Sequence, residues 1–308
     1  MSQNKRLVIA GATGSIGRYL CQELGNSGYE ITVLARDPTG ARTAVPSAKK
    51  IVKFDYEGGD GWFRELDGSL GVINLSGAPI FKRWTKRYMN EIIDSRVKTT
   101  GAIVDAIRIA KDRPRFLVNA SAAGYYGYDG GGVDTVTESS PAGNDFWGKF
   151  VSKWEGEAKK ANDLGVRVSL IRTTVVLVKG EGALGLLVPL FRKGIGGYVK
   201  SATPWFPWIH MSDEVSLIKF AIENNQIYGA INASSPNIPT MQEFSATLGK
   251  VLNKRSSIRI PPSLLRLILG KGSSVISRGL KVYPKVALDN GFKFSFPNLE
   301  DALRNLLY

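Results

Sequence analysis

Apolar and polar positions follow two alternating periods along the first half of the chain. Short apolar runs rich in β-branched residues alternate with longer stretches in which apolar residues recur every three or four positions. This pattern predicts strands alternating with helices, which is typical of a parallel sheet covered on both faces. The predicted strands are 7–10, 30–35, 50–54, 71–75, 115–120 and 167–171, and the predicted helices are 15–27, 62–66, 84–110 and 146–164. Right-handed connections would give a doubly wound α/β sheet of strand order 3-2-1-4-5-6.

The pattern changes after about residue 173. A glycine-rich stretch, 180–197, surrounds an apolar helical piece, 184–191, and the aromatic, proline-punctuated segment 202–210 is typical of a loop and an edge strand. Helices are predicted at 213–224, 240–252, 261–269, 284–290 and 299–307. We therefore expect a Rossmann core over residues 1–175. A smaller, mostly helical lobe, 176–308, is expected to interleave partly with it and to cover the carboxyl ends of the strands.

The first predicted strand runs directly into glycines spaced G-x-x-G-x-x-G and then into a helix. In this setting the first glycine permits a tight turn, the second lets the backbone approach a pyrophosphate, and the third allows close helix–strand packing. The start of the helix would then face the phosphates. The alternative is a glycine-rich turn that binds nothing. The residues expected to hold a dinucleotide here are Gly11, Thr13, Gly14, Ser15, Ile16 and Gly17.

Residues at the ends of the next strands favour NADP(H) over NAD(H). Arg36 follows the second strand, where an arginine suits a 2′-phosphate and an acid would suit a free 2′-hydroxyl. Asp37 comes next, so a solvated Arg36–Asp37 pair is the alternative. Asp55 would accept a hydrogen bond from the adenine amine or cap the following turn. The small residues of Leu75-Ser76-Gly77 would allow the backbone to lie under a ribose.

The composition limits which partners, metal sites and cellular locations are expected. The formal net charge is +14, and residues 249–308 hold eleven Lys/Arg against three acids. A nucleic acid, an anionic membrane surface or a phosphorylated substrate would suit such a lobe, but without an accompanying nucleic-acid motif a solvated basic face is the favoured interpretation. One cysteine and one histidine make a Cys/His zinc site untenable, and no metal is expected. No signal peptide or apolar run of about 18 residues is visible, so the cytoplasm or an organelle interior is expected. Nothing in the pattern indicates an oligomeric state.

Three motifs taken together resemble the extended and atypical short-chain dehydrogenase/reductases: the glycine turn, Val72–Gly77 and Asn119–Gly127. Further segments are similar to one branch, the epimerase-like family, whose members are also labelled nucleoside-diphosphate-sugar epimerase-like or cell-division-inhibitor-like. These segments are Arg83-Trp84, Ser95-Arg96, Lys153–Ala158, Arg167–Thr173, Trp208–His210 and Pro284–Glu300. The resemblance covers nearly the whole chain. It implies an NADP(H)-binding Rossmann fold and an oxidoreductase or epimerase acting on an unknown small substrate.

The chain departs from this superfamily at its catalytic pair. Dehydrogenases of the superfamily carry Tyr-x-x-x-Lys, in which the lysine lowers the pKa of the tyrosine and anchors the ribose. None of the eleven tyrosines here is followed four residues later by lysine. Aligning the helix on Lys153, which would hold the ribose or remain solvated, puts Lys149 in the tyrosine position.

The segment after the fifth predicted strand offers groups that would replace the missing catalytic tyrosine. Counting back from the Tyr-Gly pair places the usual hydroxyl position at Ala122, one residue from Ser121. Ser121 would bond a substrate carbonyl or close the turn. Tyr125 and Tyr126 would act as acids or pack beneath the cofactor. These three are the catalytic candidates.

Five residues are candidates for a substrate pocket: Arg83, Trp84, Arg96, Trp208 and His210. The first three would form a lid or an anion clamp for a small-molecule substrate with an anionic group. A single histidine at a strand end is more often structural than catalytic. Two functions remain open, an NADP(H)-dependent enzyme and a catalytically silent NADP(H) sensor or scaffold, beside a role for the basic lobe on nucleic acid or membrane.

Overall fold

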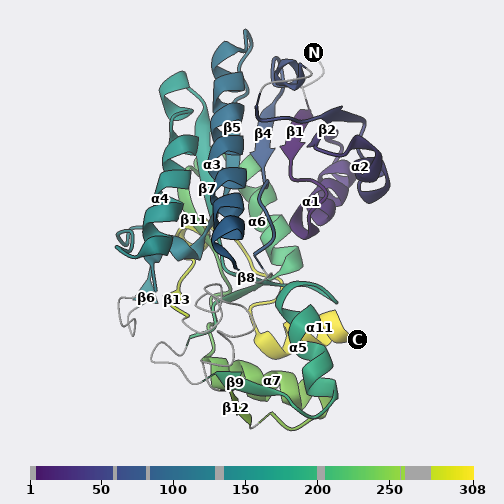
Figure 1. Cartoon of the computed structure of the whole chain (residues 1–308), viewed down its shortest axis with the longest axis vertical. Helices are drawn as coiled ribbons and strands as arrows, with labels where there is room; N and C mark the ends of the chain where they lie inside the picture. The colour runs from purple at the N-terminus through teal and green to yellow at the C-terminus, as the bar shows by residue number, and fades with distance from the viewer. Residues whose placement is uncertain are drawn as a thin grey trace.

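A seven-stranded parallel sheet forms the centre of the molecule (Figure 1). The computed structural model describes residues 5–57, 61–80, 84–128, 135–199, 205–256, 258–260 and 279–308. The strand order is β3-β2-β1-β4-β5-β7-β11, and every neighbouring pair is parallel. The strands are β1 (Arg6–Ala10), β2 (Glu30–Ala35), β3 (Lys50–Lys53), β4 (Gly71–Asn74), β5 (Phe116–Ala122), β7 (Arg167–Thr173) and β11 (Gly229–Ala233).

The predicted doubly wound α/β fold is therefore confirmed, with the expected order in its first six strands. The seventh strand, β11, was not predicted. Its sequence Gly-Ala-Ile-Asn-Ala contains one large apolar residue, which is too little periodicity to reveal a strand.

Helices cover both faces of the sheet because successive strand side chains point to opposite sides. Leu7 and Ile9 pack toward α1 (Ser15–Asn26), α2 (Pro38–Ala44) and α6 (Met211–Glu223). Val8 and Ala10 pack toward α3 (Lys86–Ile109) and α4 (Phe146–Lys159). The short η1 (Trp62–Glu65) lies on this second face. The sheet is thus buried on both sides, as its continuous apolar strands predicted.

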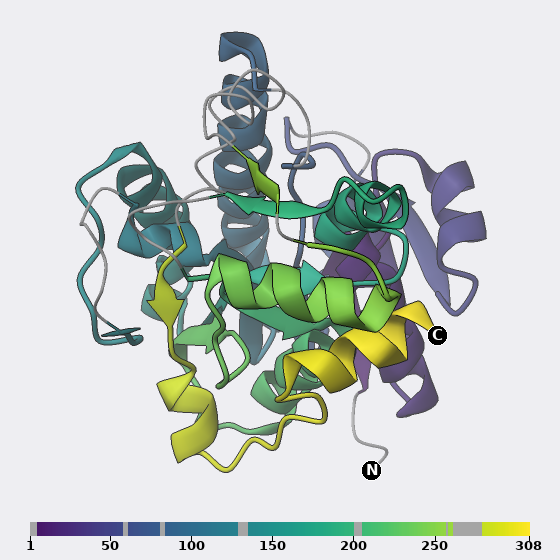
Figure 2. The ribbon, with the colours of Figure 1, turned by 90° about the horizontal axis from the view of Figure 1, so that it is seen from below.

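The remaining elements form a lobe at the carboxyl ends of the strands (Figure 1). Its helices α7 (Met241–Leu252) and α11 (Leu299–Leu307) lie side by side and share an apolar core with α5 (Gly182–Arg192) (Figure 2). Three short parallel pairs tie distant segments together: β8 (Val175–Leu177) with β10 (Trp208–His210), β9 (Gly197–Val199) with β12 (Ile258–Ile260), and β6 (Thr135–Val136) with β13 (Lys281–Val282). The short helix α10 (Lys285–Asp289) follows β13. The predicted helix 261–269 lies outside the described residues.

The second half of the chain also supplies parts of the main sheet. Helix α6 packs against one face, and β11 adds the strand beside β7. Elements from the second half of the chain therefore extend the main sheet and cover one of its faces.

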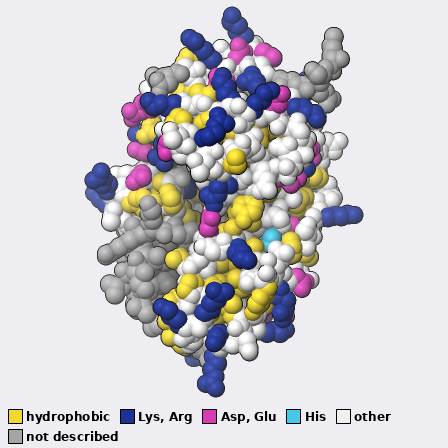
Figure 3. Space-filling view, turned by 90° about the vertical axis from the view of Figure 1, so that its right-hand side faces the viewer, with side chains coloured by type: hydrophobic (Ala, Val, Ile, Leu, Met, Phe, Trp, Pro, Cys, Tyr) yellow, Lys and Arg dark blue, Asp and Glu magenta, His cyan; other side chains and the backbone are white. Residues whose placement is uncertain are grey.

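Basic side chains are spread over the molecule. Figure 3 shows Lys and Arg scattered over the upper and lower parts of the face drawn. In the C-terminal region, Lys285 pairs with Asp289, and both Lys250 and Arg304 pair with Glu300. Among the described residues, no helix combines the length and apolarity needed to cross a membrane.

A buried ion pair joins the helix α4 to the sheet. The Arg172 guanidinium on β7 donates to both Glu155 carboxylate oxygens, at 2.8 and 3.0 Å. The two residues are 2% and 1% exposed, respectively. Ser121 donates to the same carboxylate at 2.7 Å, and Arg172 also donates to the Tyr126 hydroxyl at 3.0 Å. Hydrogen bonds therefore satisfy both charges inside the protein, as burial of an ion pair requires.

Removing one partner of this ion pair should destabilise the folded protein. Arg172→Met is expected to lower the free energy of unfolding by about 3–5 kcal/mol, because it leaves the Glu155 charge buried and unpaired. The control is Lys159→Met, since its half-exposed ammonium lies 3.6 Å from the same carboxylate and should contribute less than about 1 kcal/mol. Urea denaturation measures both variants, and equal losses would contradict the account.

Candidate functional site

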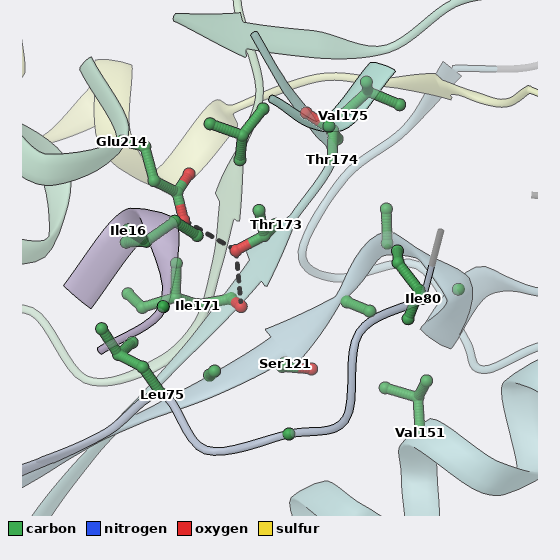
Figure 4. Close-up of a pocket in the computed structure, with 18 of the residues that line it drawn as sticks. Ile16, Leu75, Ile80, Ser121, Val151, Ile171, Thr173, Thr174, Val175 and Glu214 are labelled. Atoms are coloured by element: carbon green, nitrogen blue, oxygen red, sulfur yellow. Dashed lines mark hydrogen bonds between the residues drawn. The ribbon is translucent and has the colours of Figure 1, made fainter. Parts of the chain in front are cut away.

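A cavity of about 600 Å³ lies at the carboxyl ends of the sheet, between the core and the lobe. The core supplies the glycine turn, the segment after β4, the end of β5 and one face of α4. The lobe side supplies the β7–β8 connection, the start of α6, and residues around Phe206 and Leu280. The walls are mostly apolar (Figure 4). The strand order reverses at this edge of a doubly wound sheet, which is where such folds bind ligands.

The glycine turn has the geometry that its spacing predicts. Gly11 has a φ of +80°, and a Cβ there would lie 2.5 Å from the Leu75 carbonyl carbon. A Cβ on Gly17 would lie 2.4 Å from the Gly11 oxygen. At Gly14 a Cβ would meet only the Gly11 oxygen, at 3.4 Å, so this position is open to the cavity. No side chain caps α1. Its first N–H groups can therefore bind a phosphate.

The lobe is fastened to this turn by Glu181, the residue that precedes α5. Its carboxylate accepts a hydrogen bond from the Ser15 hydroxyl and forms an ion pair with Arg18 at 2.6 Å. Arg18 also donates to the Thr13 carbonyl. Thr13 is exposed and does not line the cavity, whereas Ser15 and Ile16 do.

Arg36 and Asp55 lie beyond the cavity, at the end of β2 and just after β3. Arg36 is exposed. The Asp37 carboxylate accepts from the Thr39 and Gly40 amides, both at 3.1 Å, and so caps α2. No ion pair between Arg36 and Asp37 is described, and the exposed Arg36 guanidinium can be reached by an incoming phosphate. Asp55 accepts from the Glu57 amide at 2.9 Å, which is the turn-capping role that we weighed as its alternative.

The helix α4 presents different residues to the cavity from those expected. Lys149 and Lys153 are exposed and absent from its wall. Trp147 and Val151, also four residues apart, line it instead. The residues that α4 turns toward the cavity are thus not those of the alignment on Lys153, and the geometry does not support a ribose contact from this lysine. The helix begins at Phe146, with Asp145 as its cap, and that fixes which face turns inward.

Tyr125 and Tyr126 lie behind the cavity wall. The Tyr126 hydroxyl donates to Asn232 at 2.6 Å and accepts from Arg172, while the Tyr125 ring lies 3.4 Å from the Arg172 guanidinium carbon. Burial raises the pKa of Tyr126 to about 12. The expected acid role of these two phenols therefore lacks a route to the cavity. The phenol in the described wall is that of Tyr128, whose pKa is raised by burial and by Asp145.

Ser121 does line the cavity, at the end of β5. Its hydroxyl proton is directed to Glu155, so it is held in the buried network and is not free to turn toward a ligand without breaking that bond.

The five substrate-pocket candidates separate in the structure. Arg96 lines the cavity. Trp84 supports its wall indirectly, packing on Trp147 with ring centroids 4.9 Å apart. Trp208 is fully buried in the lobe core. Arg83 lies outside the described residues.

His210 has a structural role rather than a place in the cavity wall. Its Nδ1 accepts from the Ser212 amide and so caps α6, and its ring stacks on Phe296. Burial lowers the pKa of His210 to about 4, so the ring is neutral at physiological pH.

Arg96 places a positive charge in a wall that is mostly apolar. Its Nη1 donates to the carbonyls of Ala78 and Ile92, both at 3.2 Å, and its guanidinium carbon lies 5.4 Å from the Trp154 ring centroid. Burial lowers the pKa of Arg96 to about 10, which still leaves it charged at neutral pH. It also lies directly beneath Gly77, where a Cβ would come within 2.7 Å of the guanidinium.

Glu214, which the sequence did not single out, is a buried carboxyl in the cavity wall. One of its oxygens accepts from the Thr173 hydroxyl at 2.8 Å (Figure 4). The other has no partner among the described residues. Burial raises the pKa of Glu214 to about 7. The sequence signal was the run Ser212-Asp213-Glu214, but a run of this kind is typical of a helix start and carries no sign of burial.

The raised pKa predicts a pH-dependent stability. The folded state disfavours the charged form, so wild-type stability falls as pH rises from about 4.5 through 7. The unfolding free energy of Glu214→Gln minus that of wild type should therefore increase by roughly 2 to 3 kcal/mol from pH 5 to pH 8. Urea unfolding at several pH values checks this, with exposed Glu91→Gln as the control. A difference that stays constant across this range would refute the burial of a titrating carboxyl.

Comparison with known proteins agrees with this geometry. A model of the NAD dependent epimerase/dehydratase family matches residues 7–234, and a model of a domain of unknown function (DUF1731) matches residues 260–306. The chain is 40% identical over 301 residues to the chloroplastic SDR39U1 homolog of Arabidopsis thaliana, covering 97% of this chain and 86% of that protein. It is 32% identical to human epimerase family protein SDR39U1, covering 98% and 99% of the two chains.

Solved structures show the same similarity. Human SDR39U1 (isoform 2), crystallised with NADPH, superposes with a TM-score of 0.87 at 31% identity and 98% coverage of both chains. A nucleoside-diphosphate sugar epimerase from Corynebacterium glutamicum gives a TM-score of 0.77 at 27% identity, covering 99% of this chain and 58% of that one. Fold, motifs and relatives agree that this chain belongs to the NAD dependent epimerase/dehydratase family.

Proposed function

We propose that this protein binds NADP(H) and uses it as an oxidoreductase or epimerase on a small substrate. The observation that carries the proposal is the continuous cavity that begins at the glycine turn and ends against the lobe. One end presents the uncapped start of α1, which suits a diphosphate. The other end is enclosed by apolar side chains, which suits a ring and a small second molecule.

The described residues fit the cofactor along its length. The open position at Gly14 and the first N–H groups of α1 would hold the diphosphate, and Leu75–Gly77 would lie under a ribose. Arg36, free of Asp37, would bind the 2′-phosphate. The NADPH in the structure of human SDR39U1 supports the same preference. A bound nicotinamide supplies or accepts a hydride.

The groups around the other end suggest how the substrate is handled. Arg96 would attract an anionic group of the substrate, and the apolar wall would exclude water from the rest of the substrate. Tyr128, protonated at neutral pH, is the phenol that would move a proton, because Tyr126 is committed to Arg172 and Asn232. The competing function is a silent NADP(H) sensor, and the presence of Trp147 and Val151 on α4 favours it.

The cofactor preference is tested at Arg36. Arg36→Ala should weaken NADPH binding about 10- to 100-fold because it removes a charge-assisted contact to the 2′-phosphate, and it should change NADH binding less than about twofold. Fluorescence titration of both nucleotides measures this, with exposed Arg42→Ala on α2 as the control. An equal loss for NADPH and NADH would reject the assignment of Arg36.

Turnover is tested with a panel of small carbonyl compounds and two matched tyrosine variants. Tyr128→Phe should lower kcat for NADPH oxidation at least tenfold while leaving the NADPH Kd unchanged, since it removes only the proton donor. Tyr126→Phe should preserve kcat and cost about 1–3 kcal/mol of stability, because it removes a buried hydrogen bond from each of Asn232 and Arg172.

The same assay separates the two functions. The sensor would be favoured if the protein binds NADPH tightly, no carbonyl compound oxidises the bound NADPH, and no sugar nucleotide is epimerised. Unchanged turnover in Tyr128→Phe would overturn the assignment of its phenol.

A further inference from the structure

Glu214 offers a hydrogen-bonding atom that the protein itself does not use. The side chain is 1% exposed and lies in the cavity wall at the start of α6. Thr173 occupies one carboxyl oxygen, and the second oxygen, Oε2, has no partner among the described residues. Leaving a buried polar atom unpaired costs free energy, and such atoms in native proteins usually meet a ligand or water. The Glu214 residue is part of the wall of a cavity large enough for a ligand, and its unpaired oxygen is buried at that wall.

The location of Glu214 indicates which part of a dinucleotide it would meet. Thr173 is the last residue of β7, and Ile16 in the first turn of α1 lies beside the carboxyl group (Figure 4). In a doubly wound sheet the two mononucleotide halves bind over different sets of strands. The adenosine half belongs to β1, β2 and β3, where Arg36 and Asp55 lie, and the nicotinamide half therefore belongs to β4, β5 and β7. Glu214 stands on the nicotinamide side.

The surroundings of the Glu214 carboxyl group indicate which chemical group would bind to it. The described side chains beside it, Ile16 and Ile171, are apolar, and no described ion pair involves Glu214. Among the described residues, the only side-chain hydrogen bond of this carboxyl group comes from a neutral hydroxyl. A neutral hydrogen-bond donor carried by a flat, apolar ring suits this setting better than a second anion or a metal ion. The nicotinamide carboxamide is such a group.

We propose that Glu214 is a binding residue whose free oxygen accepts a hydrogen bond from the amide N–H of the nicotinamide carboxamide. This inference rests on the proposed binding of NADP(H). An acceptor oxygen is present in both protonation states of glutamate and also in glutamine. Glu214→Gln should therefore retain the contact, whereas Glu214→Leu, whose apolar side chain has no acceptor, should lose it.

Three probes distinguish the carboxamide from the rest of the cofactor. NADPH carries the amide, the reduced 3-acetylpyridine analogue replaces the amide NH₂ by a methyl group, and 2′-phospho-ADP-ribose lacks the ring altogether. Wild-type protein should bind NADPH about tenfold more tightly than the acetylpyridine analogue. Glu214→Leu should bind the two with equal affinity, within about twofold, and Glu214→Gln should keep most of the preference. All three proteins should bind 2′-phospho-ADP-ribose alike.

The outcomes are separable by isothermal titration calorimetry. An undiminished preference for NADPH in Glu214→Leu would overturn the inference while leaving the proposed function intact. An equal loss of affinity for all three probes would also overturn it, because Glu214 would then shape the cavity as a whole. Failure of the wild-type protein to bind both NADPH and 2′-phospho-ADP-ribose would instead refute the proposed function.

Discussion

The buried ion pair between Glu155 and Arg172 determines much of the architecture around the cavity. It fixes α4 against β7, orients Ser121 at the end of β5, and holds Tyr126 against Asn232 of β11. Hydrogen bonds through Glu138 then extend the network to α10, since this carboxylate accepts from the amides of Asn232 and Val286. Charges that are buried this completely persist only in well-defined geometry, and they make one side of the cavity a rigid wall.

The network also determines which polar groups are available in the cavity. Two hydroxyls that looked available in the sequence, on Ser121 and Tyr126, have their protons directed into the network. Three ionisable residues in the cavity wall come from other elements: Tyr128 beyond β5, Arg96 on α3 and Glu214 on α6. The proposed binding of NADP(H) and the proposed chemistry on a substrate would thus depend on different parts of the fold, and only the binding motif follows the pattern of the superfamily.

The sheet order and the glycine turn could be predicted because they depend on local patterns. A β-branched run followed by spaced glycines constrains the backbone at Gly11 and Gly17 whatever the rest of the chain does. The face of α4 could not be predicted in this way. Lys149–Lys153 and Trp147–Val151 share the same four-residue spacing, and tertiary packing alone decides which pair turns inward. Glu214 was missed for a related reason, since burial of a charged side chain at a helix start leaves no mark on periodicity.

In the lobe, too, local features could be predicted from the sequence and long-range contacts could not. Thr240 and Glu243 form a capping box that marks the start of α7, so this helix was predictable from local sequence. The pairing of β8 with β10 and of β6 with β13 joins segments far apart in the chain, and no local signal specifies such partners. Val175 and Val176 of β8 and Val282 of β13 line the cavity, so these long-range pairings shape its wall.

The most direct test of the account is a crystal structure of the protein soaked with NADPH. The account predicts the diphosphate on the first N–H groups of α1 between Gly11 and Gly17, the 2′-phosphate on Arg36, and the nicotinamide over the ends of β4, β5 and β7 with its amide on Glu214. Electron density for NADPH bound away from the glycine turn, or a cavity closed to it at saturating concentration, would contradict the central claim.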